Sequence, residues 1–132
     1  MNIEEFITGV RTRIETISDI SAYSPELPIA DDNDDDYAAA VTMLGGTVQN
    51  SLGTSRLYNN VLFRVIIRGL RNNDTDIRAM VDSVYDKLNM ANGIALTSSK
   101  IVLIYADTDV QYIGKDDNER ILYNINFRAI IE

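Results

Sequence analysis

The side chains that most often carry out catalysis are missing from this chain, which has 132 residues and no histidine, cysteine or tryptophan. Their absence removes the commonest general base, the thiol nucleophile and nearly all transition-metal ligands. Serine and lysine are present, but no G-x-S-x-G elbow, S-x-x-K pair or G-x-x-x-x-G-K-S/T phosphate loop occurs. Two of the 20 acidic residues could meet by chance, but so short a chain has little room for a glycosidase cleft. We therefore expect no enzyme and no cofactor.

An acidic run at residues 31–36 contains five aspartates in six positions. From Asp32 onward the spacing matches the first ligands of a calcium loop, but Tyr37 replaces the required glycine and Met43 the closing glutamate. No calcium loop is predicted, although weak attraction of cations is an alternative. Repulsion between the carboxylates predicts an exposed, mobile acidic loop near residues 29–36. Its candidate contact residues are Asp34, Asp35 and Asp36.

Arginines and bulky apolar side chains share the outer side of two predicted strands. Arg64, Arg68 and Arg128 are candidate contact residues, because their guanidinium groups could form ion pairs with acids of the same or a neighbouring subunit. Alternatively, they only solvate the outer face. The apolar side chains on this face would be exposed to solvent in a monomer, which indicates self-association. The alternative is that the helices or the glycine-rich loop cover them. They are Leu62, Ile66, Leu122 and Ile130.

Composition places the chain among small acidic proteins with one core. The formal net charge is −8 and 45% of the residues are hydrophobic, which predicts a single domain over residues 1–132. The charge opposes adhesion to nucleic acid, and it would suit either passage of DNA without binding or simple solubility. No apolar run approaches the roughly 20 residues of a membrane span. Acids near the N-terminus predict no secretory signal.

Hydrophobic periodicity predicts two amphipathic helices, one over residues 2–18 and one between a cap at Asp74 and a stop at Gly93. A polar loop is expected near residues 45–60. The order of helix, strands, helix, strands predicts an α+β fold, in which an antiparallel (mixed) β-sheet carries both helices on one face. The predicted strands cover residues 37–44, 60–70, 100–106 and 120–131.

An ordered series of residues runs through the second half of the chain, from about Asn60 onward. It consists of Val65-Ile66-Ile67-Arg68-Gly69, Val84-Tyr85-Asp86-Lys87-Leu88, Tyr112-Ile113-Gly114-Lys115-Asp116, Arg120 and Asn126-Phe127. This series resembles the small tail-terminator or head–tail joining proteins of long-tailed bacteriophages, a group that includes phage minor capsid proteins. The first half of the chain resembles them only in layout. Asp116 and Arg120 of the series join the candidate contact residues.

The resemblance implies a structural virion protein that assembles as a hexameric ring, caps the tail tube and stops its polymerisation. The implied partners are other copies of the chain, the major tail tube protein and the head connector or stopper protein. DNA would pass through the lumen without specific binding, and no membrane partner is implied. The protein would belong to the tail or neck of the virion and be assembled in the host cytoplasm. Alternatives are a head-completion or connector-stopper protein, a tube or baseplate component, a small non-viral adaptor and, most distantly, a metal-dependent nuclease.

Overall fold

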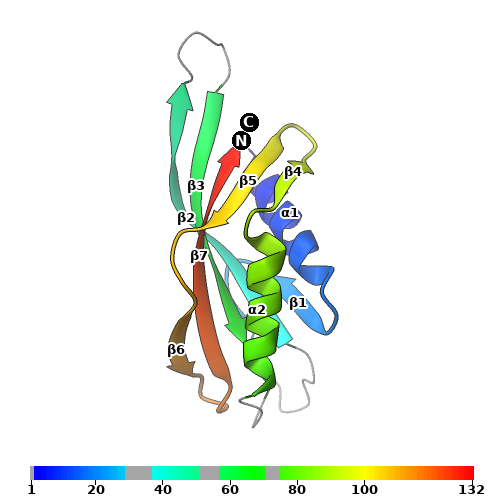
Figure 1. Ribbon diagram of the computed structural model, residues 1–132, viewed down its shortest axis with the longest axis vertical. Helices are drawn as coiled ribbons and strands as arrows, with labels where there is room; N and C mark the ends of the chain where they lie inside the picture. The colour runs from blue at the N-terminus through cyan, green and yellow to red at the C-terminus, as the bar shows by residue number, and fades with distance from the viewer. Residues whose placement is uncertain (1, 29–36, 51–56, 71–74) are drawn as a thin grey trace.

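The computed structural model describes residues 2–28, 37–50, 57–70 and 75–132 (Figure 1). Two helices and seven strands form in these parts of the chain. In chain order they are α1 (Ile3–Glu15), β1 (Ile20–Tyr23), β2 (Tyr37–Asn50), β3 (Leu57–Arg68), α2 (Asp76–Leu88), β4 (Asn92–Ala95), β5 (Lys100–Ala106), β6 (Gln111–Lys115) and β7 (Ile121–Ile131).

All seven strands join one sheet, in the order β1-β2-β3-β7-β5-β4, with β6 paired to β7. Strands β1 and β2 are parallel, and the other neighbours are antiparallel. Strand β7 is central, because it pairs with β3 along one side and with β5 and then β6 along the other. Both helices cover the same face of this sheet (Figure 1). The predicted α+β fold with a mixed sheet and two helices is therefore confirmed.

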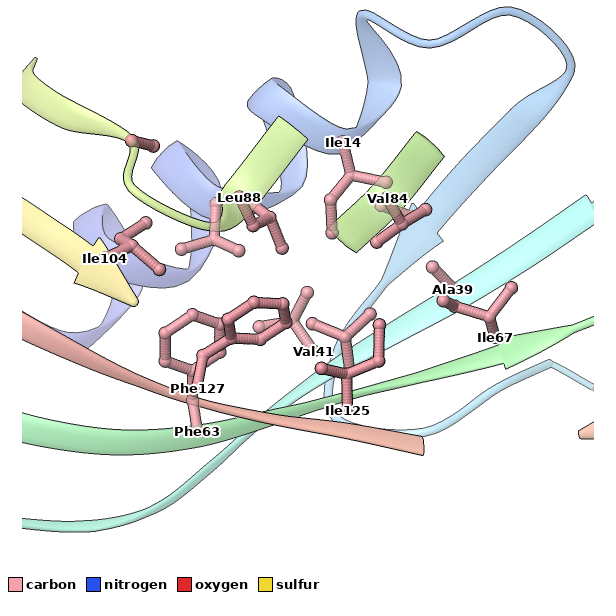
Figure 2. Packing of buried hydrophobic residues seen from close by; sticks show 14 of the residues in the cluster. Ile14, Ala39, Val41, Phe63, Ile67, Val84, Leu88, Ile104, Ile125 and Phe127 are labelled. Atoms are coloured by element: carbon pink, nitrogen blue, oxygen red, sulfur yellow. The ribbon is translucent and has the colours of Figure 1, made fainter. Parts of the chain in front are cut away.

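The core lies between that face and the helices. Phe63 pairs with Phe127, and Val65 with Ile125, in the register of β3 and β7, so the four side chains project to the same side. The Phe63 and Phe127 rings stack with centroids 5.4 Å apart, and Phe6 of α1 meets Phe63 edge-on at 5.3 Å. Figure 2 shows side chains of both helices pointing toward these strands. Such aromatic packing joins α1 to the two central strands without a disulfide.

Helix α1 begins at an Asn2 cap, whose side-chain oxygen accepts a hydrogen bond from the Glu5 amide at 3.2 Å. It ends at Glu15, earlier than the predicted residue 18, and Asp19 beyond it has a positive φ of 69°. Apolar residues at helical spacing are buried on the sheet side of both helices. They are Phe6, Ile7, Val10 and Ile14 in α1 and Ile77, Val81, Val84 and Leu88 in α2.

Helix α2 also ends earlier than predicted. Asn89 is extended and Met90 takes the left-handed φ of 65°, so the helix stops at Leu88 before the expected glycine, Gly93, is reached. The predicted cap, Asp74, lies outside the described residues, and the N-cap position belongs to Thr75. Neither α1 nor α2 has the length and apolar content to cross a membrane, and the described residues contain no other helix.

The polar loop expected near residues 45–60 is largely replaced by strand. Strand β2 continues through Gly45 and Gly46 to Asn50, paired with β3 down to Leu57. A register shift between Met43 and Gly45 marks an irregularity in the ladder, and Gly45 has a φ of 146° that other residues rarely adopt. The paired strands project upward in Figure 1 as a long hairpin. The acidic loop expected near residues 29–36 lies outside the described residues.

Candidate assembly surface

Because both helices cover one face of the sheet, the opposite face has no helical layer in the described parts of the chain. We call this opposite side of β3 and β7 the outer face. Its side chains are Leu62, Arg64, Ile66 and Arg68 of β3 and Leu122, Asn124, Asn126, Arg128 and Ile130 of β7. The structure thus places the three arginines predicted to share a face on that face.

Arg64 lies at the centre of the outer face, with Thr42 of β2 on one side and Asn126 of β7 on the other. Its side chain is half-buried, and its Nε atom is buried without a hydrogen-bond partner. No carboxylate of the described residues forms an ion pair with it. An unsatisfied buried donor usually costs about 1–3 kcal/mol, so this position is poorly satisfied in an isolated subunit.

Arg68 has a different role at the end of the same strand. Its residue exposes only 4% of its surface, and Nη1 donates a hydrogen bond to the carbonyl oxygen of Pro28. The Thr42 hydroxyl donates a hydrogen bond to the carbonyl oxygen of Pro25 at 2.6 Å. The Ser24 hydroxyl donates one to the carbonyl oxygen of Val41 at 2.7 Å. These bonds attach the segment after β1 to the end of the outer face. Arg68 therefore holds this segment and has little surface left for another molecule.

Arg128 is already paired with an acid. Its Nε lies 2.8 Å from Oδ1 of Asp107, in the turn after β5. This hydrogen bond, helped by the negative charge of Asp107, raises the pKa of Arg128 above its usual value. Of the alternatives left open for the arginines, an ion pair within the subunit thus applies to Arg128. Sequence reasoning missed Asp107 as the partner, since nothing in the sequence fixes which turn residue faces β7.

Apolar side chains surround Arg64 on the outer face. Leu62, Ile66, Leu122 and Ile130 are all half-buried. Neither α1 nor α2 covers them, because both helices lie on the other side of the sheet. The sequence left open self-association and covering by the helices or the glycine-rich loop, and covering by the helices is therefore excluded. Partly exposed apolar side chains around an arginine are typical of a protein–protein interface.

Asp116 and Arg120 are committed to the turn between β6 and β7. Oδ1 of Asp116 accepts hydrogen bonds from the amides of Asn118 and Arg120, both at 2.9 Å. The Arg120 residue is 1% exposed, and its Nη1 donates to the Gly69 carbonyl oxygen at 3.4 Å. The structure therefore gives both residues a structural role in the turn. Asp34, Asp35 and Asp36 lie outside the described residues.

Two hollows on the surface lie wholly among described residues and are considered as candidate ligand sites. The larger, of about 390 Å³, lies between α1 and β4 and is lined by Glu4, Glu5, Thr8, Gly9, Thr12 and residues 94–97. The smaller, of about 260 Å³, lies between Leu27, Pro28 and the turn that contains Asp116. No group of three or more histidine, cysteine, aspartate or glutamate residues that could hold a metal occurs in the described parts of the chain. Neither hollow provides a recognisable catalytic arrangement.

On the opposite side of the molecule, the exposed side of α2 carries two aspartates. Asp82 and Asp86 are exposed and lie one helical turn apart, where like charges repel. Neither forms an ion pair with another residue that the structure describes. Sequence reasoning did not single out this pair, although the i, i+4 spacing within a predicted helix is a signal that could have identified it.

Comparison with known proteins places the chain among phage structural proteins. A family model described as bacteriophage tail terminator protein matches residues 17–132, which include every described strand and α2. No curated protein sequence matches the chain. Among solved structures, the fold is similar to a chain in the virion of a native gene transfer agent particle. The TM-score is 0.66 and the identity 13%, over 98% of this chain and 96% of that one, so the likeness establishes a shared fold.

Proposed function

Because the chain belongs to the bacteriophage tail terminator family, we propose that it closes the finished tail tube as a ring and stops further addition of tube subunits. The family match over residues 17–132 carries this proposal, and it makes the chain a structural component of the virion tail or neck. The ring would contain six copies, as the sequence resemblance implies. Its free side would then offer a docking surface to the head connector.

Two features of the subunit support an assembly role. The outer face combines half-buried apolar side chains with Arg64, whose charge no described carboxylate neutralises. The net charge of −8 would keep DNA from adhering as it passes through the ring. Capping is then steric: a bound ring occupies the site at which the next tube subunits would add. Assembly of this kind would take place in the host cytoplasm and requires no catalytic group.

The decisive test is polymerisation of the purified tail tube protein with and without this chain. We expect capped tubes of limited length, with a ring visible at one end by negative-stain electron microscopy. Light scattering over a concentration series should show a species near six times the 14.8 kDa chain mass. Tubes that grow to the same length with and without the chain would contradict the proposal. Binding to isolated heads instead of tails would indicate a head-completion or connector-stopper protein.

A further inference from the structure

The exposed side of α2 carries two carboxylates, Asp82 and Asp86, which form no ion pair with another described residue. Asp82 and Asp86 project away from the buried residues Val81 and Val84 of the same helix. Arg78, one turn before Asp82, forms no ion pair with it. The two carboxylates thus repel each other and would gain from a cation placed between them. Ala79 and Ser83, both exposed, lie on the same side of the helix and are small enough to allow close approach of another surface.

The outer face presents the opposite charge on the opposite side of the sheet. Arg64 has no acidic partner among the described residues, and its neighbour diagonally across the ladder is a second arginine, Arg128. Arg128 is already paired with Asp107, which leaves Arg64 as the arginine of this face without a described carboxylate partner. A carboxylate from another molecule would neutralise Arg64, and the half-buried Leu62 and Ile66 would be covered by the same contact.

We propose that the outer face of one copy binds the exposed side of α2 of a second copy, with Arg64 placed between Asp82 and Asp86. The occupant is identified by charge complementarity, because Arg64 on one side of the sheet and the Asp82–Asp86 pair on the helix that covers the other side have no ion-pair partner among the described residues. Since the two surfaces differ, the contact is head-to-tail, and its repetition forms a ring where the rotation between neighbouring copies closes on itself. The inference rests on the proposed ring and names the surfaces that form it.

The test reverses the charges on each side and then on both together. The variants are Arg64→Glu, the double variant Asp82→Lys with Asp86→Lys, and the triple variant that combines them. Light scattering and sedimentation over a concentration series give the dissociation constant of each assembly. We expect each one-sided variant to raise that constant at least about tenfold, and the triple variant to return it to within a few-fold of wild type. Circular dichroism and thermal unfolding confirm that each subunit remains folded.

Matched controls carry the same charge changes elsewhere. Lys100→Glu changes an exposed base on β5, and Glu4→Lys with Glu15→Lys changes two exposed acids on α1. We expect assembly of both controls to equal that of wild type. A ring whose stability is unaffected by the Arg64 and α2 variants would overturn this contact and leave the proposed function intact. Loss of tube capping without loss of the ring would assign the outer face to the tube protein and also overturn it. A chain that neither forms rings nor caps tubes would overturn the proposed function itself.

Discussion

Nη1 of Arg120 donates a hydrogen bond to the carbonyl oxygen of Gly69, 3.4 Å away in space and 51 residues away in the chain. The amide of Gly69 in turn donates to the carbonyl oxygen of Ile121 at 2.9 Å. These bonds join the end of β3 to the start of β7. Gly69 and Arg120 both belong to the residue series that resembles the tail-terminator proteins. In this structure they form hydrogen bonds that connect the two central strands, which gives this part of the series a structural role.

Replacement of Arg120 by methionine tests how much this hydrogen bond contributes to stability. The substitution keeps much of the side-chain volume but leaves the Gly69 carbonyl oxygen without its charged donor. Hydrogen bonds to charged groups contribute roughly 1.5–3 kcal/mol, so we expect a loss of about that size in the free energy of unfolding, measured with urea. Lys100→Met, at an exposed position, should change it by less than about 0.5 kcal/mol. Unchanged stability with lost ring assembly would instead assign Arg120 to a contact between subunits.

Asp116 can be tested for shape and charge separately. Its carboxylate accepts two amide hydrogen bonds in the β6–β7 turn, and an asparagine side chain can accept the same bonds without the charge. We expect Asp116→Asn to unfold within about 0.5 kcal/mol of wild type and Asp116→Ala to lose about 1–3 kcal/mol, because two turn amides lose their acceptor. If Asp116→Asn is stable but impairs assembly, the charge of Asp116 serves a partner and a purely structural role is contradicted.

The raised pKa of Tyr37 leads us to expect a loss of stability in alkaline solution. Burial raises the pKa of its phenol above the ordinary value of 10.0, with smaller contributions from the charges of Asp76 and Asp19. Because the folded pKa is the higher one, the stabilisation is complete below pH about 10 and is lost as the pH rises through the folded pKa. The free energy of unfolding should therefore fall more steeply above pH 10 in wild type than in Tyr37→Phe. Parallel pH profiles for the two proteins, determined by urea titration, would contradict this prediction.

The elements predicted from the sequence are those whose own residues carry a periodic pattern. Helices α1 and α2 show apolar residues at helical spacing, and β3 and β7 alternate over more than ten residues, which also placed Arg64 and Arg128 on one face. The short strands β1, β4 and β6 have four, four and five residues. Segments this short carry no readable period, and they become strands because a longer neighbour supplies their hydrogen bonds.

The roles of individual site residues depended on contacts between distant segments. Arg68 is buried because the chain after β1 brings the Pro28 carbonyl oxygen to it, and no pattern around residue 68 indicates this. Arg128 is paired because the register of β5 against β7 brings Asp107 within 2.8 Å. The sequence predicted a face shared by three arginines, but only the fold separates Arg64, which lacks an acidic partner in the described residues, from the other two.

Gly9 offers a test of how closely α1 approaches the end of β4. A Cβ atom at this position would lie 2.8 Å from Cδ2 of Leu96, too close unless the leucine moves. In a helix interior, alanine is favoured over glycine by about 1 kcal/mol. We therefore expect Gly9→Ala to change the free energy of unfolding little in wild type but to stabilise the Leu96→Ala variant by about 1 kcal/mol. Ser83→Ala, on the exposed side of α2, should have the same effect in both backgrounds. Equal effects of Gly9→Ala in the two backgrounds would show that Leu96 does not restrict the position, because the coupling energy of this double-mutant cycle would then be zero.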